Sequence, residues 1–412
     1  MATTGAAAGN ADVTSDPLVE PIPAGLTRGG AVRLDAIDML RGLVIVFMVL
    51  DHVRDFFHAP PGSFDPTDPL KSYPALYLTR WVTHLCAPTF VFLAGVSILF
   101  QQANGKSPAE LSRFLLTRGA WLVFLEWTVV SFGFNFGEPF VFLQVIWAIG
   151  MSMIAMALIS RLPPRAVLLL GAAILLLYPL AVPATAGATG ALAILRTFAF
   201  APAMIPGTPI FAFYSVVPWL SVMCLGFGLG PLFRLPPAER SRALLILAAA
   251  LLTAFIILRV IDGYGDPVPW VTEPTEARTA MSFFNVSKYP PSPDYVCVTL
   301  GFSMLLFLAL QHLRGPVSRV LLDFGRTPLF TYVCHLYIAH GLMLLVAIAL
   351  NTPGAALDLL AKEFRGDPPS GFGYSLPVVY LGGALVIALL IPLARWMAAL
   401  KRRRRDWWLG YI

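Results

Sequence analysis

Long apolar stretches separated by short polar segments dominate the chain from residue 37 onwards. A helix needs about 20 mostly apolar residues to cross a bilayer. Stretches of about this length recur at 37–58, 79–101, 115–135, 140–160, 165–184, 210–232, 242–261, 294–313, 326–350 and 375–398. A further apolar stretch, 189–205, is short and bounded by proline, which favours an interfacial or re-entrant segment. The pattern predicts an all-α membrane bundle of ten transmembrane helices.

The two ends of the chain differ from this pattern. Residues 1–30 are rich in Ala, Gly, Thr and Pro and lack the apolar core of a secretory signal peptide. The C-terminal end combines the basic run 401–405 with Trp407 and Trp408, which is typical of an anchor at an anionic leaflet. We therefore predict a flexible cytosolic tail over 1–32, a ten-helix domain over 33–400 and a basic, aromatic cytosolic tail over 401–412.

Composition supports the membrane interpretation. The 412 residues are 57% hydrophobic and only 13% charged. A soluble domain carries about 25% charged residues, and a disordered chain is poor in apolar residues. Both classes are therefore excluded. The four cysteines show no metal-binding or disulfide spacing, so we expect free thiols and no metal site.

The net charge of +6 is a topology signal. Most of the 29 Lys and Arg residues fall in alternate connecting segments, which lie inside if the N-terminus is cytosolic. Acidic residues gather in the other segments. The sequence therefore predicts that both termini are cytosolic, and it disfavours nucleic acid as the partner of the basic excess.

Ionisable groups inside a span are costly and usually functional, and the first span carries most of them. At its outer end stand Asp51, His52 and Asp55. His52 lies about 17 Å along the helix from Arg41, in the outer half of the bilayer. A carboxylate beside the imidazole would raise its basicity and fix its tautomer, as a general base requires. The alternative is a histidine that only completes a hydrogen-bond network.

At the inner end of the same span, Asp35, Asp38 and Arg41 follow a three-residue spacing. Such residues can pair along one helix face. They either form a salt bridge that fixes the helix start, or they leave Arg41 to meet an anionic cofactor.

The second span begins with Arg80 and His84, one turn apart, followed by Pro88. Proline frees the backbone carbonyl one turn before it, near His84, and can kink the helix towards a cavity. The structural alternative is an Arg80 that snorkels and a His84 that packs.

Two later segments add candidates. The ninth span carries His335 and His340, which point to different faces, so one can line a cavity while the other bonds between helices. The long outer segment 262–293 includes Lys288 and two prolines, which suggest a stiff lid with a positive tip.

Several segments together resemble the heparan-alpha-glucosaminide N-acetyltransferase catalytic-domain family, in its bacterial branch. They are 37–42, 51–58, 78–95, 144–150, 218–219, 288–291, 324–329 and 406–409. The start Asp38-x-x-Arg41-Gly42, with His52 eleven residues after Arg41, is also similar to membrane acyltransferases that modify bacterial sugars. In those families the histidine that matches His52 is taken as catalytic. In the lysosomal member the active histidine lies in the following loop, which His58 resembles.

The resemblance implies transfer of an acetyl group from cytosolic acetyl-CoA to an amine or hydroxyl of a carbohydrate or cell-envelope acceptor on the far side. It implies a bacterial inner membrane protein that contacts lipids, and it leaves a homodimer open. Inner arginines would hold the CoA phosphates. The candidate catalytic residues are His52, His58, Asp51, Asp55 and His84. The candidate cofactor-binding residues are Arg41, Arg80, Lys288 and His340.

Histidine can act here as a general base or can form an acetyl-histidine intermediate. The alternative function is a proton-coupled transporter that uses the histidines as a relay. No repeated pair of Gly- or Pro-broken helices, which would favour such a transporter, is evident in the sequence. An acyltransferase needs a tunnel from the cytosolic face to the level of His52 and His58.

Overall fold

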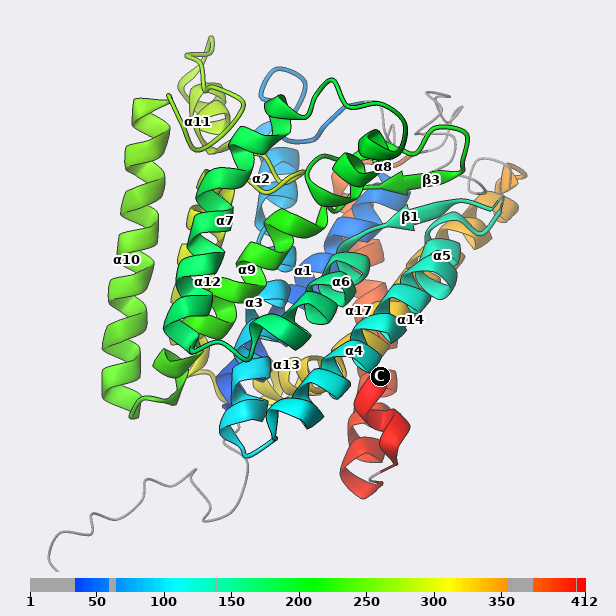
Figure 1. The fold of residues 1–412 in the computed structure, drawn as a ribbon. Helices are drawn as coiled ribbons and strands as arrows, with labels where there is room; N and C mark the ends of the chain where they lie inside the picture. Colours follow the sequence, from blue (N-terminus) through cyan, green and yellow to red (C-terminus); the bar gives the residue numbers. More distant parts are fainter. Residues whose placement is uncertain (1–33, 59–63, 138, 354–356, 358–372, 405) are drawn as a thin grey trace, which may run out of the picture. The chain divides into compact units, whose positions relative to one another are not determined.

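The structure, a computed structural model, describes residues 34–58, 64–137, 139–353, 357, 373–404 and 406–412. The tail predicted over 1–32 lies outside these residues. Helices make up most of the described chain, together with one small sheet (Figure 1). The α-helices are α1 (Asp35–Phe57), α2 (Pro74–Thr83), α3 (Cys86–Ala103), α4 (Pro108–Leu125), α5 (Ser131–Asn135), α6 (Val145–Ile159), α7 (Pro164–Ala184), α8 (Gly190–Ala199), α9 (Val216–Leu229), α10 (Pro237–Ile261), α11 (Glu276–Phe284), α12 (Pro293–Leu310), α13 (Pro316–Arg326), α14 (Pro328–Ala349) and α17 (Leu376–Arg403).

Eight helical segments of the described chain are long and apolar enough to cross a membrane, which confirms a helical membrane protein. They are Pro74–Ala103, Pro108–Asn135, α7, Val216–Arg234, α10, α12, α14 and α17. Several expose rows of large apolar side chains, such as Leu176, Leu177 and Leu180 on α7 and Ile256 and Ile257 on α10. Apolar surface of this extent fits a lipid environment better than water.

The other two predicted spans differ from the eight. Helix α1 has 23 residues and sufficient length, but it carries charged residues at both ends. Helix α6 has only 15 residues and is about 22 Å long. The prediction of a single helix over 140–160 was wrong at its start, because 141–143 form strand β1 (Val141–Leu143).

Strand β1 belongs to a three-stranded sheet with β2 (Ala203–Met204) and β3 (Ile210–Ala212), in the order β1-β3-β2. Strands β1 and β3 are parallel, with Val141 opposite Ile210, and β2 is antiparallel to β3. The all-α expectation therefore holds for the bulk of the chain but misses this sheet. Its strands are two or three residues long, too short for an alternating pattern to reveal them.

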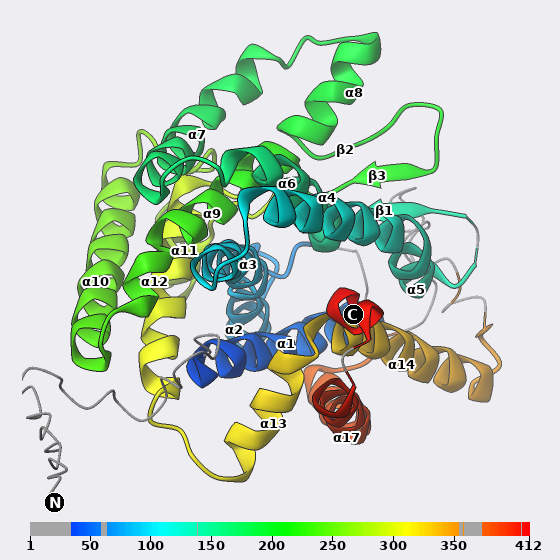
Figure 2. The ribbon, with the colours of Figure 1, turned by 60° about the horizontal axis from the view of Figure 1, so that its bottom comes forward.

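Helix α1 is the central element of the site. It packs against α13, α14 and α17 and also against α2, α3 and α12 (Figure 2). A helix with neighbours on several sides is screened from lipid, which explains how it accommodates charged residues.

Where a kink was expected from Pro88, the spanning segment is interrupted between α2 and α3, which end at Thr83 and begin at Cys86. Pro88 has no N–H to bond the carbonyl of His84. The hydroxyl of Tyr295 on α12 donates to that carbonyl instead, at 2.8 Å. A contact from another helix thus stabilises the break.

At the C-terminal end, regular structure continues past residue 400, where the tail was predicted to begin. Helix α17 continues to Arg403, and the 3₁₀ turn η3 (Trp407–Tyr411) follows. The turn packs against α4, where Arg118 donates to the carbonyl of Gly410 and Trp121 donates to the carbonyl of Tyr411. The end of the described chain is therefore docked on the bundle.

Candidate active site

The centre of the site is a pair of buried histidines on two helices. Nδ1 of His52 on α1 lies 2.6 Å from Nε2 of His335 on α14. Their rings are stacked, with centroids 4.9 Å apart, and Tyr332 contacts both rings edge-on. A contact this short means that one ring donates its N–H to the other. If Nδ1 of His52 is the donor, its Nε2 keeps a free lone pair, as a general base needs.

His335 was left undecided by the sequence, because helical spacing does not show which histidine of α14 faces α1. His340 is placed differently. Its Nδ1 lies 2.8 Å from the carbonyl oxygen of Gly133, and its ring stacks on Phe136 and Phe56. These are packing contacts between helices, outside the histidine pair.

The carboxylates next to His52 form ion pairs with arginines. Asp51 accepts two hydrogen bonds from Arg80, both at 2.9 Å, and one from Thr83 at 2.8 Å. Arg54 forms an ion pair with Asp51 at 3.0 Å and another with Asp55. The hydrogen-bond partner of the His52 imidazole within the described chain is therefore His335, while the neighbouring carboxylates are paired with arginine.

Oxygen atoms of Asp51 and Asp55 and a ring nitrogen of His52 do lie within 4.8 Å of one another. Such a group could ligate a cation. Both carboxylates, however, are already paired with arginine. The negative charge of these two carboxylates is thus already balanced by Arg54 and Arg80.

His58, the second catalytic candidate, follows the last residue of α1. It is part-buried, and its backbone pairs with that of Tyr374 ahead of α17. His58 lies about 9 Å along the helix direction beyond His52.

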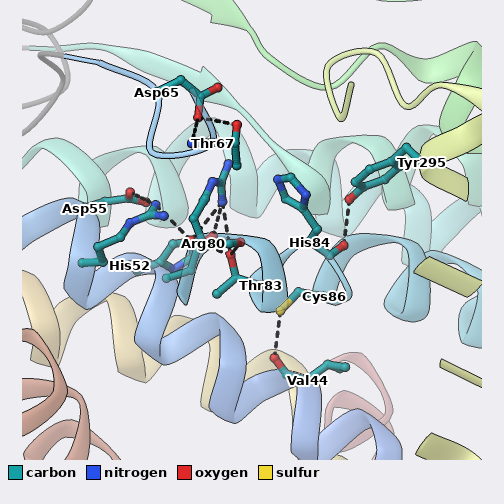
Figure 3. A network of polar contacts seen from close by, with 12 residues as sticks. Val44, His52, Asp55, Asp65, Thr67, Arg80, Thr83, His84, Cys86 and Tyr295 are labelled. Carbon is teal, nitrogen blue, oxygen red and sulfur yellow. Dashed lines mark hydrogen bonds and ion pairs between the residues drawn. The ribbon is translucent and has the colours of Figure 1, made fainter. Parts of the chain in front are cut away.

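Lys288 is not the tip of a lid. The residue is only 7% exposed, and its ammonium lies 5.0 Å from the ring centre of Tyr289. Its charge acts on Asp51, His52 and His84, so it belongs to the C-terminal end of α1. His84 is equally buried, and Figure 3 shows its ring rising from the end of α2 beside Arg80.

At the N-terminal end of α1, Arg41 forms the salt bridge of the first alternative and also borders a cavity. Its guanidinium pairs with Asp38 at 3.1 Å and donates to Ser97. It also lines a cavity of about 280 Å³ between α1, α3, α4, α6 and α14. Arg118 and Gly410 line the same cavity near this end.

The cavity extends from Arg41 to Tyr332, next to the histidine pair, although neither His52 nor His335 is among its lining residues. Its wall includes Met48, one turn before His52, and Tyr332, which contacts both histidine rings. The remaining lining is apolar for the most part, with Phe90, Ile98 and Leu122 as examples. We call this space the donor cavity.

Glu126 is a buried acid that was not among the candidates predicted from the sequence. It opens the π-helical turn η1 (Glu126–Val130) inside the span that contains α4. Its Oε2 accepts from the backbone N–H of Trp147 at 2.7 Å, near the start of α6. A single acid in the apolar stretch 115–135 was a readable signal, since ionisable residues inside spans are seldom incidental.

The fold and the site define a polytopic membrane protein with a buried polar centre fed by a cavity. Residues 33–261 match the family described as heparan-alpha-glucosaminide N-acetyltransferase, catalytic. The match covers more than half of the chain, so the protein belongs to this family and is a membrane acetyltransferase. It includes His52, His58, Arg80 and His84, whereas Lys288 and His335 lie beyond it. No curated protein matches the chain.

Proposed function

We propose that the protein transfers an acetyl group from acetyl-CoA across the membrane to an amine or hydroxyl of a carbohydrate or cell-envelope acceptor. The donor cavity carries this proposal, because Arg41 and Arg118 line it together with Tyr332, whose ring contacts both members of the histidine pair. We place the N-terminal end of α1 at the cytosolic face of a bacterial inner membrane, with both termini inside and ten crossings.

The size and lining of the donor cavity suit part of the donor. Sites for drug-sized ligands measure about 300–1,000 Å³. A cavity of about 280 Å³ with an apolar wall fits the extended pantetheine arm. The nucleotide would stay at the mouth, where the guanidinium forks of Arg41 and Arg118 suit phosphate oxygens.

His52 would act as the general base through Nε2, while His335 accepts the N–H of Nδ1 and holds the ring. The acceptor nitrogen or oxygen attacks the thioester carbon and gives its proton to His52. The new bond forms as the carbon–sulfur bond breaks, and the CoA thiolate leaves with the proton that His52 took from the acceptor. Asp51 would position the site by holding Arg80 and Arg54.

Tyr332 would support the same step. Its hydroxyl is buried and has no hydrogen-bond partner among the described residues, although the residue lines the donor cavity. A free hydroxyl at this place can donate to the thioester oxygen as negative charge develops there.

The test is transfer of labelled acetyl from acetyl-CoA by the purified protein in lipid nanodiscs, with hexosamines as acceptors. His52→Ala should lower the rate roughly 100-fold or more, the usual effect of removing a general base. His335→Ala should act in the same direction, and His58→Ala tests the second candidate. His340→Gln is the matched control on α14.

Two results would contradict the proposal. Retained transfer in both His52→Ala and His58→Ala would remove the catalytic assignment. A wild-type protein that neither binds nor turns over an acyl-CoA would remove the enzymatic function and favour the transporter.

A further inference from the structure

Positive charge exceeds negative charge where α1 ends and α2 meets the segment before α12. Arg54 and Lys288 are buried, and the side chain of Arg80 is 12% exposed. The buried carboxylate among them is Asp51, while the side chain of Asp55 is 46% exposed. Three buried or nearly buried cations thus face one buried anion, whereas the carboxylates of Asp55 and Asp65 are on exposed residues. Buried charges are normally matched by partners.

Several donors of this group lack hydrogen-bond partners. Nη1 of Arg54 and Nδ1 of His84 are buried without a partner among the described residues. For Lys288, the ring of Tyr289 is the contact found for the ammonium within the described chain. Buried polar atoms are paired in the great majority of structures, so an unpaired set at one place calls for a missing ligand or water.

This group, which we call the outer cationic cluster (Arg54, His84 and Lys288), is separate from the donor cavity. None of its residues is among those that line that cavity. It lies beyond His52 along α1, since Arg54 follows His52 whereas Arg41 and Met48 precede it, and the charges of Arg54 and Lys288 both act on His84. The cluster is therefore placed towards the acceptor, while Arg41 and Arg118 are placed towards the donor.

We propose that the outer cationic cluster binds an anionic group of the acceptor, a phosphate, sulfate or carboxylate, and so places the neighbouring amine or hydroxyl at His52. The inference rests on the proposed acetyl transfer for the identity of the bound molecule. Oxygen atoms of such a group can accept from the Lys288 ammonium, from Nη1 of Arg54 and from Nδ1–H of His84. The binding would balance the surplus charge and satisfy the free donors together.

A matched pair of acceptors tests the specificity. Glucosamine and glucosamine 6-phosphate differ by one anionic group. We expect wild-type kcat/KM to favour the phosphorylated sugar, and Lys288→Gln to reduce this ratio roughly tenfold, as for one charge-assisted hydrogen bond. Lys288→Arg should restore most of the preference. Lys71→Gln, an exposed lysine paired with Asp68, is the control and should keep it.

The outcome that contradicts the proposal is a wild-type protein with no preference for the phosphorylated sugar. If Lys288→Gln lowered kcat/KM equally for both sugars, this would also contradict the proposal, because it would indicate a role in the chemical step. Inorganic sulfate should inhibit competitively against the acceptor. Competition against acetyl-CoA instead would assign the cluster to the donor phosphates and overturn the inference.

A binding measurement separates this inference from the proposed function. Sulfate should raise the melting temperature of the purified wild-type protein above that in chloride at equal ionic strength, and Lys288→Gln should lose this gain. The gain requires no turnover, so it survives if acetyl transfer fails. Equal melting temperatures in sulfate and chloride for the wild type would show that the cluster holds no anion.

Discussion

The Tyr332 hydroxyl lies where the donor cavity meets the histidine pair, and it can be tested by removal of one oxygen atom. Tyr332→Phe keeps the ring contacts to His52 and His335 and deletes the donor. If the hydroxyl stabilises the oxyanion, we expect kcat to fall roughly 100-fold. The KM for acetyl-CoA should change much less, because the lost hydrogen bond strengthens only in the transition state.

Tyr337, on the same helix, provides the control for this variant. Its hydroxyl donates to the backbone carbonyl of Val129 at 2.8 Å, away from the cavity wall. Tyr337→Phe should therefore leave kcat near the wild-type value. Equal rates for Tyr332→Phe and the wild type would remove Tyr332 from the chemistry.

The element that places His52 and Arg41 is α1, and its packing on α13 depends on glycine. A Cβ atom at Gly42 would overlap the backbone carbonyl of Leu321, and one at Gly325 would overlap that of Asp38. The two helices therefore approach each other backbone to backbone, next to Arg41. Small residues allow this approach in membrane proteins.

Gly42→Ala tests the close approach. The added methyl group cannot fit without a shift of α13, so we expect a loss of roughly 1–3 kcal/mol in stability. The measurement is the melting temperature in detergent, together with the Kd for acetyl-CoA, which should rise if Arg41 moves. Gly383→Ala on α17 is the control, because a Cβ atom at this position would lie 3.6 Å from the Leu50 side chain, an ordinary van der Waals distance. Equal melting temperatures for the two variants would show that α1 and α13 tolerate separation.

At the scale of the whole molecule, the two ends of the described chain meet at the donor cavity. Arg41 near the start and Gly410 near the end both line it. Thr117, Arg118 and Trp121 of α4 hold the turn η3 by hydrogen bonds of 2.7–3.0 Å. The final turn is thus part of the cavity wall.

Deletion of 406–412 should open the cavity and weaken donor binding. We expect a several-fold higher Kd for acetyl-CoA and a lower melting temperature, because three hydrogen bonds of about 1 kcal/mol each are lost. Binding of acetyl-CoA measured by calorimetry checks the first effect. The control replaces the exposed Arg402 and Arg403 by Gln, which removes charge but leaves η3 intact. A deletion that binds the donor like the wild type would show that η3 is dispensable.

Much of the fold was predictable because crossing a membrane imposes a strong pattern. Apolar stretches of about 20 residues marked the spanning helices, and the missing N–H of Pro88 indicated an irregularity one turn earlier, near His84. The short helix α6 and the three-stranded sheet were not predictable. A short apolar run does not distinguish a short helix from a strand. The pairing between 141–143 and 210–212 also joins positions that are far apart in the sequence.

The candidate site divides in the same way. The sequence alone determined which residues are unusual, since ionisable groups such as His52, Arg80 and His84 stand out in an apolar chain. Only the tertiary structure decided their partners, because these depend on which helix face meets which. In the structure, His52 contacts His335 and Asp51 pairs with Arg80. His340 packs between helices, and Lys288 is buried. Composition identifies where charge is costly, whereas packing between helices determines how that charge is satisfied.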